Sequence, residues 1–285
     1  SRGLGDVYKR QAYVLFRFYE IPQRDRADSI SINTNTQSAV KARDLRSNSK
    51  QILKLKKAYE AKYSNGFFAT KRGEIIPADK DKQYCIELSY LGKNLTAWYM
   101  QRPNLSYGET KIFDKYFNTL FKNDYLPEDA YALSFWMRKI MDAWTQENPL
   151  GLEEELLTMK AYAPYHLLFA ISMVFAKCNN QTNVPSPSEC LKVASENNLV
   201  DSIINIAANC LNSAISAEKN NCEQNNRSFI PQNWVKNKSC NAGIMSAIQN
   251  YFSFLPTMNK EMDSKLKNGV KIDSKYFSYR VQAED

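Results

Sequence analysis

The chain has 285 residues, of which 44% are hydrophobic, so it can bury a sizeable core and is not a disordered protein. Its formal net charge is +8, and nine glycines and ten prolines are few for this length. That composition, with little alternation of apolar and polar residues, favours a mostly helical protein.

The first eleven residues differ from the rest of the chain, because they contain no initiator Met and show no clear periodicity. They resemble the translated adapter read-through found at the ends of reading frames from assembled metagenomes. We therefore predict that residues 1–11 are a non-native lead-in and exclude them from the expected fold. On this interpretation, the chain is the C-terminal fragment of a longer protein.

Residues 12–82 are predicted to form a small α+β region. Runs of β-branched and aromatic residues are typical of strands, and apolar residues spaced near 3.6 from Ile52 to Tyr63 predict a helix whose other face is lysine. The expected elements, in chain order, are a strand at Ala12–Ile21, a helix at Lys50–Tyr63, strands at Phe67–Lys71 and Glu74–Ile76 around an Arg72–Gly73 hairpin turn, and a connector at Pro77–Lys82.

Residues 83–285 are predicted to be helical, so the expected fold class is α+β: a small N-terminal β-rich part with a basic helix, followed by a larger mostly α-helical region. Two serines, Ser106 and Ser186, stand three residues before a glutamate, which is the spacing of a helix capping box. The expected helices, in chain order, are 84–101, 106–121, 130–145, 153–159, 162–178, one from Ser186, 198–224, 239–255 ending at Pro256, and short pieces at 260–266 and 274–279.

The positive charge is concentrated in one segment. From Lys41 to Arg72 there are ten lysines and arginines and two carboxylates, a net charge of +8 that equals the charge of the whole chain. A concentrated basic segment is expected of a protein that binds a polyanion. The alternative is a solvated helix face without a partner.

Seven residues in and before this segment are candidate nucleic-acid ligands. Amide side chains both donate and accept hydrogen bonds, and an arginine can bind phosphate oxygens with two N–H groups. The candidates are Asn35, Gln37, Lys41, Arg43, Arg46, Lys71 and Arg72. In the alternative interpretation the two amides only close turns. Arg46 then pairs with Asp44 or Glu74.

Motifs for catalysis are absent from the sequence. It contains no glycine-rich nucleotide loop and no GxSxG, and its sole histidine, His166, lies in an apolar segment that favours a core position. No two of the six cysteines are closer than twelve residues, so we expect no zinc site and predict free thiols in a reducing cytoplasm. We predict no cofactor, no metal and no membrane association, because no apolar run reaches the roughly 18 residues of a membrane-spanning helix.

Several separated motifs follow one another in a characteristic order. They are Thr34–Gln37, Val40–Asn48, Gly66–Phe68, Lys71–Glu74, Gln101–Ser106 and Lys111–Phe117. Together they resemble the AIPR family of bacterial abortive-infection phage-resistance proteins, over Ala12 to about Tyr125. The resemblance implies a role in bacterial defence against phage, often in restriction-modification neighbourhoods, and it assigns no catalytic residue. Members of the family usually have more chain upstream.

The sequence is compatible with three functions. The first is a cytoplasmic anti-phage protein that binds nucleic acid through residues 41–72. The second is an effector nuclease of a defence system, with Glu74 and Glu87 as candidate acids by position and its catalytic part expected upstream of this chain. The third is a helical scaffold that binds an operon-encoded protein partner through its C-terminal region.

Overall fold

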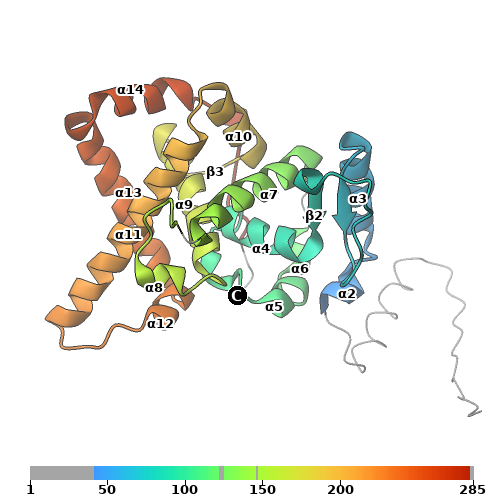
Figure 1. Cartoon of the computed structure of the whole chain (residues 1–285), viewed down its shortest axis with the longest axis horizontal. Helices are drawn as coiled ribbons and strands as arrows, with labels where there is room; N and C mark the ends of the chain where they lie inside the picture. Colours follow the sequence, from blue (N-terminus) through green and yellow to red (C-terminus); the bar gives the residue numbers. More distant parts are fainter. Residues whose placement is uncertain (1–41, 122–124, 146, 283–285) are drawn as a thin grey trace, which may run out of the picture. The chain divides into compact units, whose positions relative to one another are not determined.

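In the computed structural model, helix α9 (Ala163–Cys178) is surrounded by other helices (Figure 1). Thirteen of its sixteen residues are buried, which explains why its sequence is apolar around the whole helix instead of along one stripe. Four helices pack against it: α4 (Leu88–Trp98), α7 (Pro127–Met141), α11 (Val200–Gln224) and α13 (Lys238–Met258).

The structure describes residues 42–121, 125–145 and 147–282, and the chain divides between Ala39 and Val40, so all of them belong to one unit. The predicted lead-in and the predicted strand at Ala12–Ile21 lie outside the described residues. The other elements, in chain order, are α2 (Ala42–Arg46), α3 (Lys50–Lys62), β1 (Phe67–Ala69), η1 (Lys82–Tyr84), β2 (Cys85–Glu87), η2 (Pro103–Leu105), α5 (Glu109–Phe113), α6 (Phe117–Leu120), η3 (Asp142–Trp144), α8 (Glu154–Leu157), β3 (Val184–Pro185), α10 (Pro187–Glu196), α12 (Pro231–Lys236), α14 (Lys260–Gly269), η4 (Ser274–Tyr276) and β4 (Phe277–Ser278).

A mostly helical protein is confirmed, but the β-rich N-terminal part of the predicted α+β fold is not supported. Helix accounts for 66% of the structure and strand for only 4%, so the described chain is a mainly helical fold. Its strands form two pairs: β1 with β2, and β3 with β4. Both pairs are short and lie against helices instead of forming a separate sheet region.

The predicted hairpin around Arg72–Gly73 is wrong. Strand β1 pairs in parallel with β2, with Phe67 opposite Cys85, and residues 74–76 are not a strand. The Glu74 carboxylate accepts hydrogen bonds from the N–H groups of Thr70 and Lys71, so the chain curls back on itself before it can pair with β1. The side chain of Ile75, which a hairpin would use, is instead 86% exposed.

The proposed division at residues 82 and 83 stays a prediction. The connector at Pro77–Lys82 lies between two strands that pair with each other, and one hydrophobic core includes buried residues from Ile52 to Val270. The described residues on both sides of the connector therefore contribute to the same core.

The expected helix at 106–121 is divided into α5 and α6. The Nε–H of Arg46 donates to the carbonyl oxygen of Phe113 at 3.2 Å, an oxygen that a continuous helix would pair with the N–H of Phe117. The capping box at Ser106 does not form, because α5 begins after Gly108 and has no side-chain cap. The capping bond at Ser186 does form, since its hydroxyl accepts from the N–H of Glu189.

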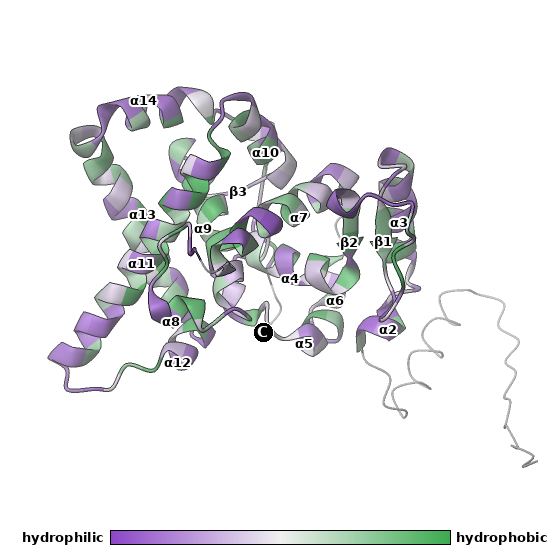
Figure 2. Cartoon of the chain, viewed as in Figure 1, coloured by the Kyte–Doolittle hydropathy of each residue, from purple (hydrophilic) through white to green (hydrophobic). Residues whose placement is uncertain are grey.

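Polar residues mark the outward parts of the helices (Figure 2). Hydrophilic residues lie along α14 and the C-terminal end of α11, whereas α9 is mostly hydrophobic. Helix α13 continues through Pro256 to Met258, so the predicted end at that proline is wrong. Within the described ranges, every helix is too short or too polar to cross a membrane.

Gly66 permits a close approach between two backbones, which gives a test of the fold. A Cβ at position 66 would lie 2.7 Å from the carbonyl oxygen of Tyr84, and this backbone atom cannot move without displacing β2. We expect Gly66→Ala to lower the free energy of unfolding by about 2 kcal/mol. Urea denaturation followed by circular dichroism measures the change.

Gly243→Ala is the matched control. A Cβ at position 243 would make an ordinary contact of 3.7 Å with the Cβ of Ala214, and alanine favours a helix interior. We expect it to raise the free energy of unfolding by about 0.5–1 kcal/mol. Equal effects of the two substitutions would contradict the close approach at Gly66.

Candidate nucleic-acid interface

Helix α3 carries the basic segment and was predicted within one residue. Ile52, Leu55 and Tyr59 are buried on its inner face. The hydroxyl of Tyr59 donates to the carbonyl oxygen of Tyr84 at 2.9 Å, which joins the helix to the end of η1. The 3.6-residue period then places most of the remaining lysines on the outer face of the helix.

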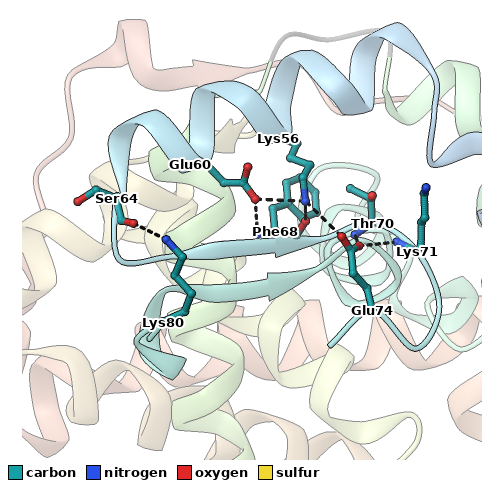
Figure 3. Close-up of polar contacts among 8 residues, drawn as sticks. All are labelled: Lys56, Glu60, Ser64, Phe68, Thr70, Lys71, Glu74 and Lys80. Carbon is teal, nitrogen blue, oxygen red and sulfur yellow. Dashed lines mark hydrogen bonds and ion pairs between the residues drawn. The ribbon is translucent and has the colours of Figure 1, made fainter. Parts of the chain in front are cut away.

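Lys56 is the exception, because its ammonium group faces the fold (Figure 3). It lies 3.2 Å from a carboxylate oxygen of Glu60 and 3.7 Å from one of Glu74. It also donates to the carbonyl oxygen of Phe68 and lies 4.6 Å from the centre of the Phe67 ring. Lys56 therefore connects α3 to β1 and to the turn that follows it.

The turn after β1 is held by Glu74. One of its carboxylate oxygens accepts from the N–H groups of Thr70 at 2.8 Å and Lys71 at 3.1 Å. Partial burial by itself raises the pKa of Glu74, but these two hydrogen bonds and the charges of Lys56 and Lys71 outweigh it, so the pKa lies below its usual value. The ionised carboxylate thus fixes the backbone that carries Lys71 and Arg72, and the Lys71 side chain points away from it (Figure 3).

Arg43 and Arg46 in α2 make internal contacts. The guanidinium of Arg43 is 3.3 Å from Asp44 and 3.3 Å from Glu109, and only 8% of its side chain is exposed. Arg46 donates to the backbone of Phe113 and stacks at 4.7 Å over the Phe117 ring. Of the two arginines, it is Arg43 that pairs with Asp44, and both hold α2 against α5 and α6.

The seven predicted ligands are therefore not one cluster in the described residues. Asn35, Gln37 and Lys41 lie outside the described ranges, and the contacts of Arg43 and Arg46 favour a structural role for these two arginines. Lys71 and Arg72 lie together at the turn and are exposed. As nucleic-acid ligands, all seven stay predictions.

Five exposed cations form what we call the exposed basic face: Lys50, Lys54, Lys57, Lys71 and Arg72. In the described part of the chain, no carboxylate pairs with the side chains of Lys57, Lys71 or Arg72. By contrast, Lys62 at the end of α3 pairs with Glu128 at 2.8 Å. Its side chains come from α3 and from the turn that Glu74 holds, two elements that Lys56 links.

Three tyrosine rings contact one another next to α3. The ring of Tyr63 stacks on Tyr84 at 5.4 Å and lies 5.1 Å from Tyr131, which in turn stacks on Tyr84 at 5.2 Å. All three are half-buried, and burial raises the pKa of Tyr63 to about 12. They come from the C-cap of α3, from η1 and from α7, so no local pattern in the sequence predicts their contact.

Burial shifts the pKa of the histidine and of several cysteines. His166 is buried, and desolvation lowers its pKa to about 4, so it is uncharged at neutral pH; its Nδ1 lies 3.1 Å from the carbonyl oxygen of Tyr162. The six cysteines are free thiols, and burial raises the pKa of Cys178 and Cys210 to about 12. No group of three or more metal-ligating side chains occurs among the described residues.

The helical region has a shallow groove of about 390 Å³ between α11 and α13. Small side chains such as Ala214 and Ala217 line it, and Phe254 and Met258 at its end are 62% and 76% exposed. An apolar groove of this kind is compatible with the predicted protein partner.

The sequence model of one protein family, described as AIPR protein, matches residues 4–226 of the chain. The chain belongs to the AIPR family. The match continues well beyond Tyr125, so the six motifs understate the extent of the resemblance, and it begins inside residues 1–11. The name of the AIPR family associates the chain with phage resistance by abortive infection. No curated protein and no solved structure matches the chain.

The role of Glu74 predicts a pH-dependent contribution to stability. Because the pKa of Glu74 is lowered in the folded protein, its contribution is present above the ordinary value of 4.5 and is lost as the pH falls through the folded value. We expect Glu74→Gln to cost about 1 kcal/mol at pH 7, after allowing for partial exposure, and less as the pH falls toward 3. Urea denaturation across this pH range measures the difference.

Glu147→Gln, at an exposed loop position, is the control for this substitution and should change the free energy of unfolding by less than about 0.5 kcal/mol. A pH-independent effect of Glu74→Gln would show that the carboxylate charge does not hold the turn.

The internal contacts of Arg43 predict a loss of stability. Arg43→Met keeps most of the side-chain volume but leaves Asp44 and Glu109 without their cation, at a cost of about 2 kcal/mol because both carboxylates are partly exposed. Lys57→Met, on the exposed face, should change the free energy of unfolding by less than about 0.5 kcal/mol. If Arg43→Met leaves stability intact and weakens nucleic-acid binding, Arg43 is a ligand instead of a structural residue.

Proposed function

We propose that this AIPR protein acts in bacterial defence against phage and binds nucleic acid through residues 41–72. The exposed basic face is the observation that carries the proposal. Lys57, Lys71 and Arg72 are exposed there without a carboxylate partner in the described residues, whereas Arg43, Arg46 and Lys56 make contacts within the fold. The site of action is the cytoplasm, and the six free thiols support this location.

The geometry supports binding to the phosphate backbone instead of reading of bases. Lys50, Lys54 and Lys57 lie along α3, and Lys71 and Arg72 follow β1, the strand that packs against this helix. Exposed lysine and arginine side chains contact phosphates, and such contacts fix position and carry no sequence information. We therefore expect similar affinity for different sequences.

The test is fluorescence anisotropy with labelled duplex DNA, single-stranded DNA and RNA at rising salt concentration. If three cations neutralise phosphates, affinity falls about 40-fold between 50 and 200 mM salt. Replacing Lys57, Lys71 and Arg72 together with glutamine should lower the slope of log affinity against log salt by about 3, for every sequence alike.

A second triple variant has the same change of net charge elsewhere. Lys111, Lys192 and Lys260 are exposed lysines outside the basic face, and their replacement with glutamine should leave the salt slope unchanged. The proposal is wrong if none of the three nucleic acids binds, if salt has no effect, or if both triple variants lose affinity equally.

The two other functions have weaker support. For the effector nuclease, Glu74 lies near Lys56, but its carboxylate is engaged by the backbone of the turn, and Glu87 is the exposed last residue of β2. For the scaffold, the groove between α11 and α13 is the candidate position of a protein partner encoded in the same operon. Restriction-modification association also stays a prediction from the family resemblance.

A further inference from the structure

An exposed apolar segment follows the basic turn. It consists of Ile75, Ile76, Pro77 and Ala78, and all four residues are exposed. In the described chain, no large apolar side chain is more exposed than that of Ile75, at 86%. We propose that Ile75 inserts between neighbouring base pairs of duplex DNA and kinks the duplex. This inference rests on the nucleic-acid binding proposed above for the exposed basic face, and it names the form of nucleic acid that is bound.

Hydrogen bonds anchor the chain on both sides of the apolar segment (Figure 3). Before it, the Glu74 carboxylate accepts from two backbone N–H groups of the turn, at 2.8 and 3.1 Å. After it, the ammonium group of Lys80 donates to the carbonyl oxygen of Ser64 at 2.8 Å. Ile75 is therefore presented by backbone that the fold already orders, so its insertion costs little conformational entropy.

Positive charge lies directly before the apolar segment. Lys71 and Arg72 are exposed, and neither pairs with a carboxylate among the described residues. Three carboxylates are also near in sequence: Glu74, Asp79 and Asp81. Backbone N–H groups engage the first and the last of these, so only Asp79 offsets the two cations. Three residues of chain span at most about 11 Å, so Arg72 can contact a phosphate close to the base step that Ile75 enters.

The side chains of this segment favour duplex DNA over single strands. Proteins that bind single strands stack the bases on aromatic rings, and residues 71–79 contain no aromatic residue. Proteins that kink duplex DNA insert apolar side chains such as isoleucine between base pairs and contact the backbone with cations. Because a β-branched side chain has few rotamers, Ile75 also loses little side-chain entropy when it is inserted.

The small size of the apolar surface favours DNA over a lipid bilayer. Proteins that lie on a bilayer bury a wide apolar face, whereas here Ile75 is the one strongly exposed isoleucine of the segment and Ile76 is only 37% exposed. Lys56 links the turn to the basic helix α3, so phosphate contacts and insertion can involve the same DNA molecule. Insertion does not read the hydrogen-bonding groups of the bases, in agreement with the similar affinity expected for different sequences.

The test adds the full chain to a duplex of about 20 base pairs that contains one easily unstacked TA step. The duplex carries 2-aminopurine at that step and a pair of dyes at its ends. We expect 2-aminopurine fluorescence to rise about twofold as the step unstacks, and energy transfer between the dyes to increase, because insertion kinks a duplex by about 20–90°. Ile75→Ser should abolish both changes, and Ile75→Leu should retain them.

Fluorescence anisotropy separates insertion from phosphate contacts. Ile75→Ser leaves every cation in place, so the slope of log affinity against log salt should stay the same. Lys71→Gln with Arg72→Gln should instead lower this slope by about 2. Met258→Ser is the matched control, because it replaces an apolar side chain of α13 that is 76% exposed, and it should leave both fluorescence signals unchanged. Circular dichroism confirms that each variant is folded.

The outcomes distinguish this inference from the function proposed above. If duplex DNA binds with the expected salt dependence but neither signal changes, or if Ile75→Ser retains both changes, insertion is overturned and phosphate binding stands. Binding of single-stranded DNA or RNA alone also overturns insertion into a duplex. If no nucleic acid binds, both proposals are wrong. Binding to phosphatidylserine vesicles that Ile75→Ser abolishes, without binding to DNA, would show that the segment enters a bilayer instead.

Discussion

The arrangement of the helices follows from one requirement: the apolar surface of α9 must be covered on all sides. An amphipathic helix needs one neighbour, but a helix with thirteen buried residues out of sixteen needs a ring of them. Each large apolar side chain buried in this way contributes about 1.5–3 kcal/mol. Helices α4, α7, α11 and α13 supply the covering faces, and their own outward faces are left for solvent and ligands.

Positive charge in this protein has two distinct roles. Arg43, Arg46 and Lys56 have lost most of their exposure and hold α2, α3 and β1 in place through carboxylates, carbonyl oxygens and aromatic rings. A buried cation of this kind is tolerated because every contact replaces part of its lost hydration. Because these three cations are engaged within the fold, the net charge of the segment overstates the charge that it offers to a partner.

The sequence predicts those features whose cause is local. Helix α3 was found because its period depends on neighbouring residues, and β1 because two phenylalanines follow a turn signal. The strand partner of β1 was not found, since β2 has only three residues and its register is set by burial of Ile86. Likewise, the burial of Arg43 depends on Glu109, a residue far along the chain, and no local pattern distinguishes it from an exposed arginine.

The parallel pairing of β1 with β2 also limits how the protein can be divided. Two parallel strands require a long connection, and here that connection contains the basic turn. Because β2 runs directly into α4, the turn is attached at both ends to the helical body. The basic helix and turn therefore depend on the helical body for two contacts: a segment ending before Tyr84 would leave β1 without its partner strand and the Tyr59 hydroxyl without its acceptor.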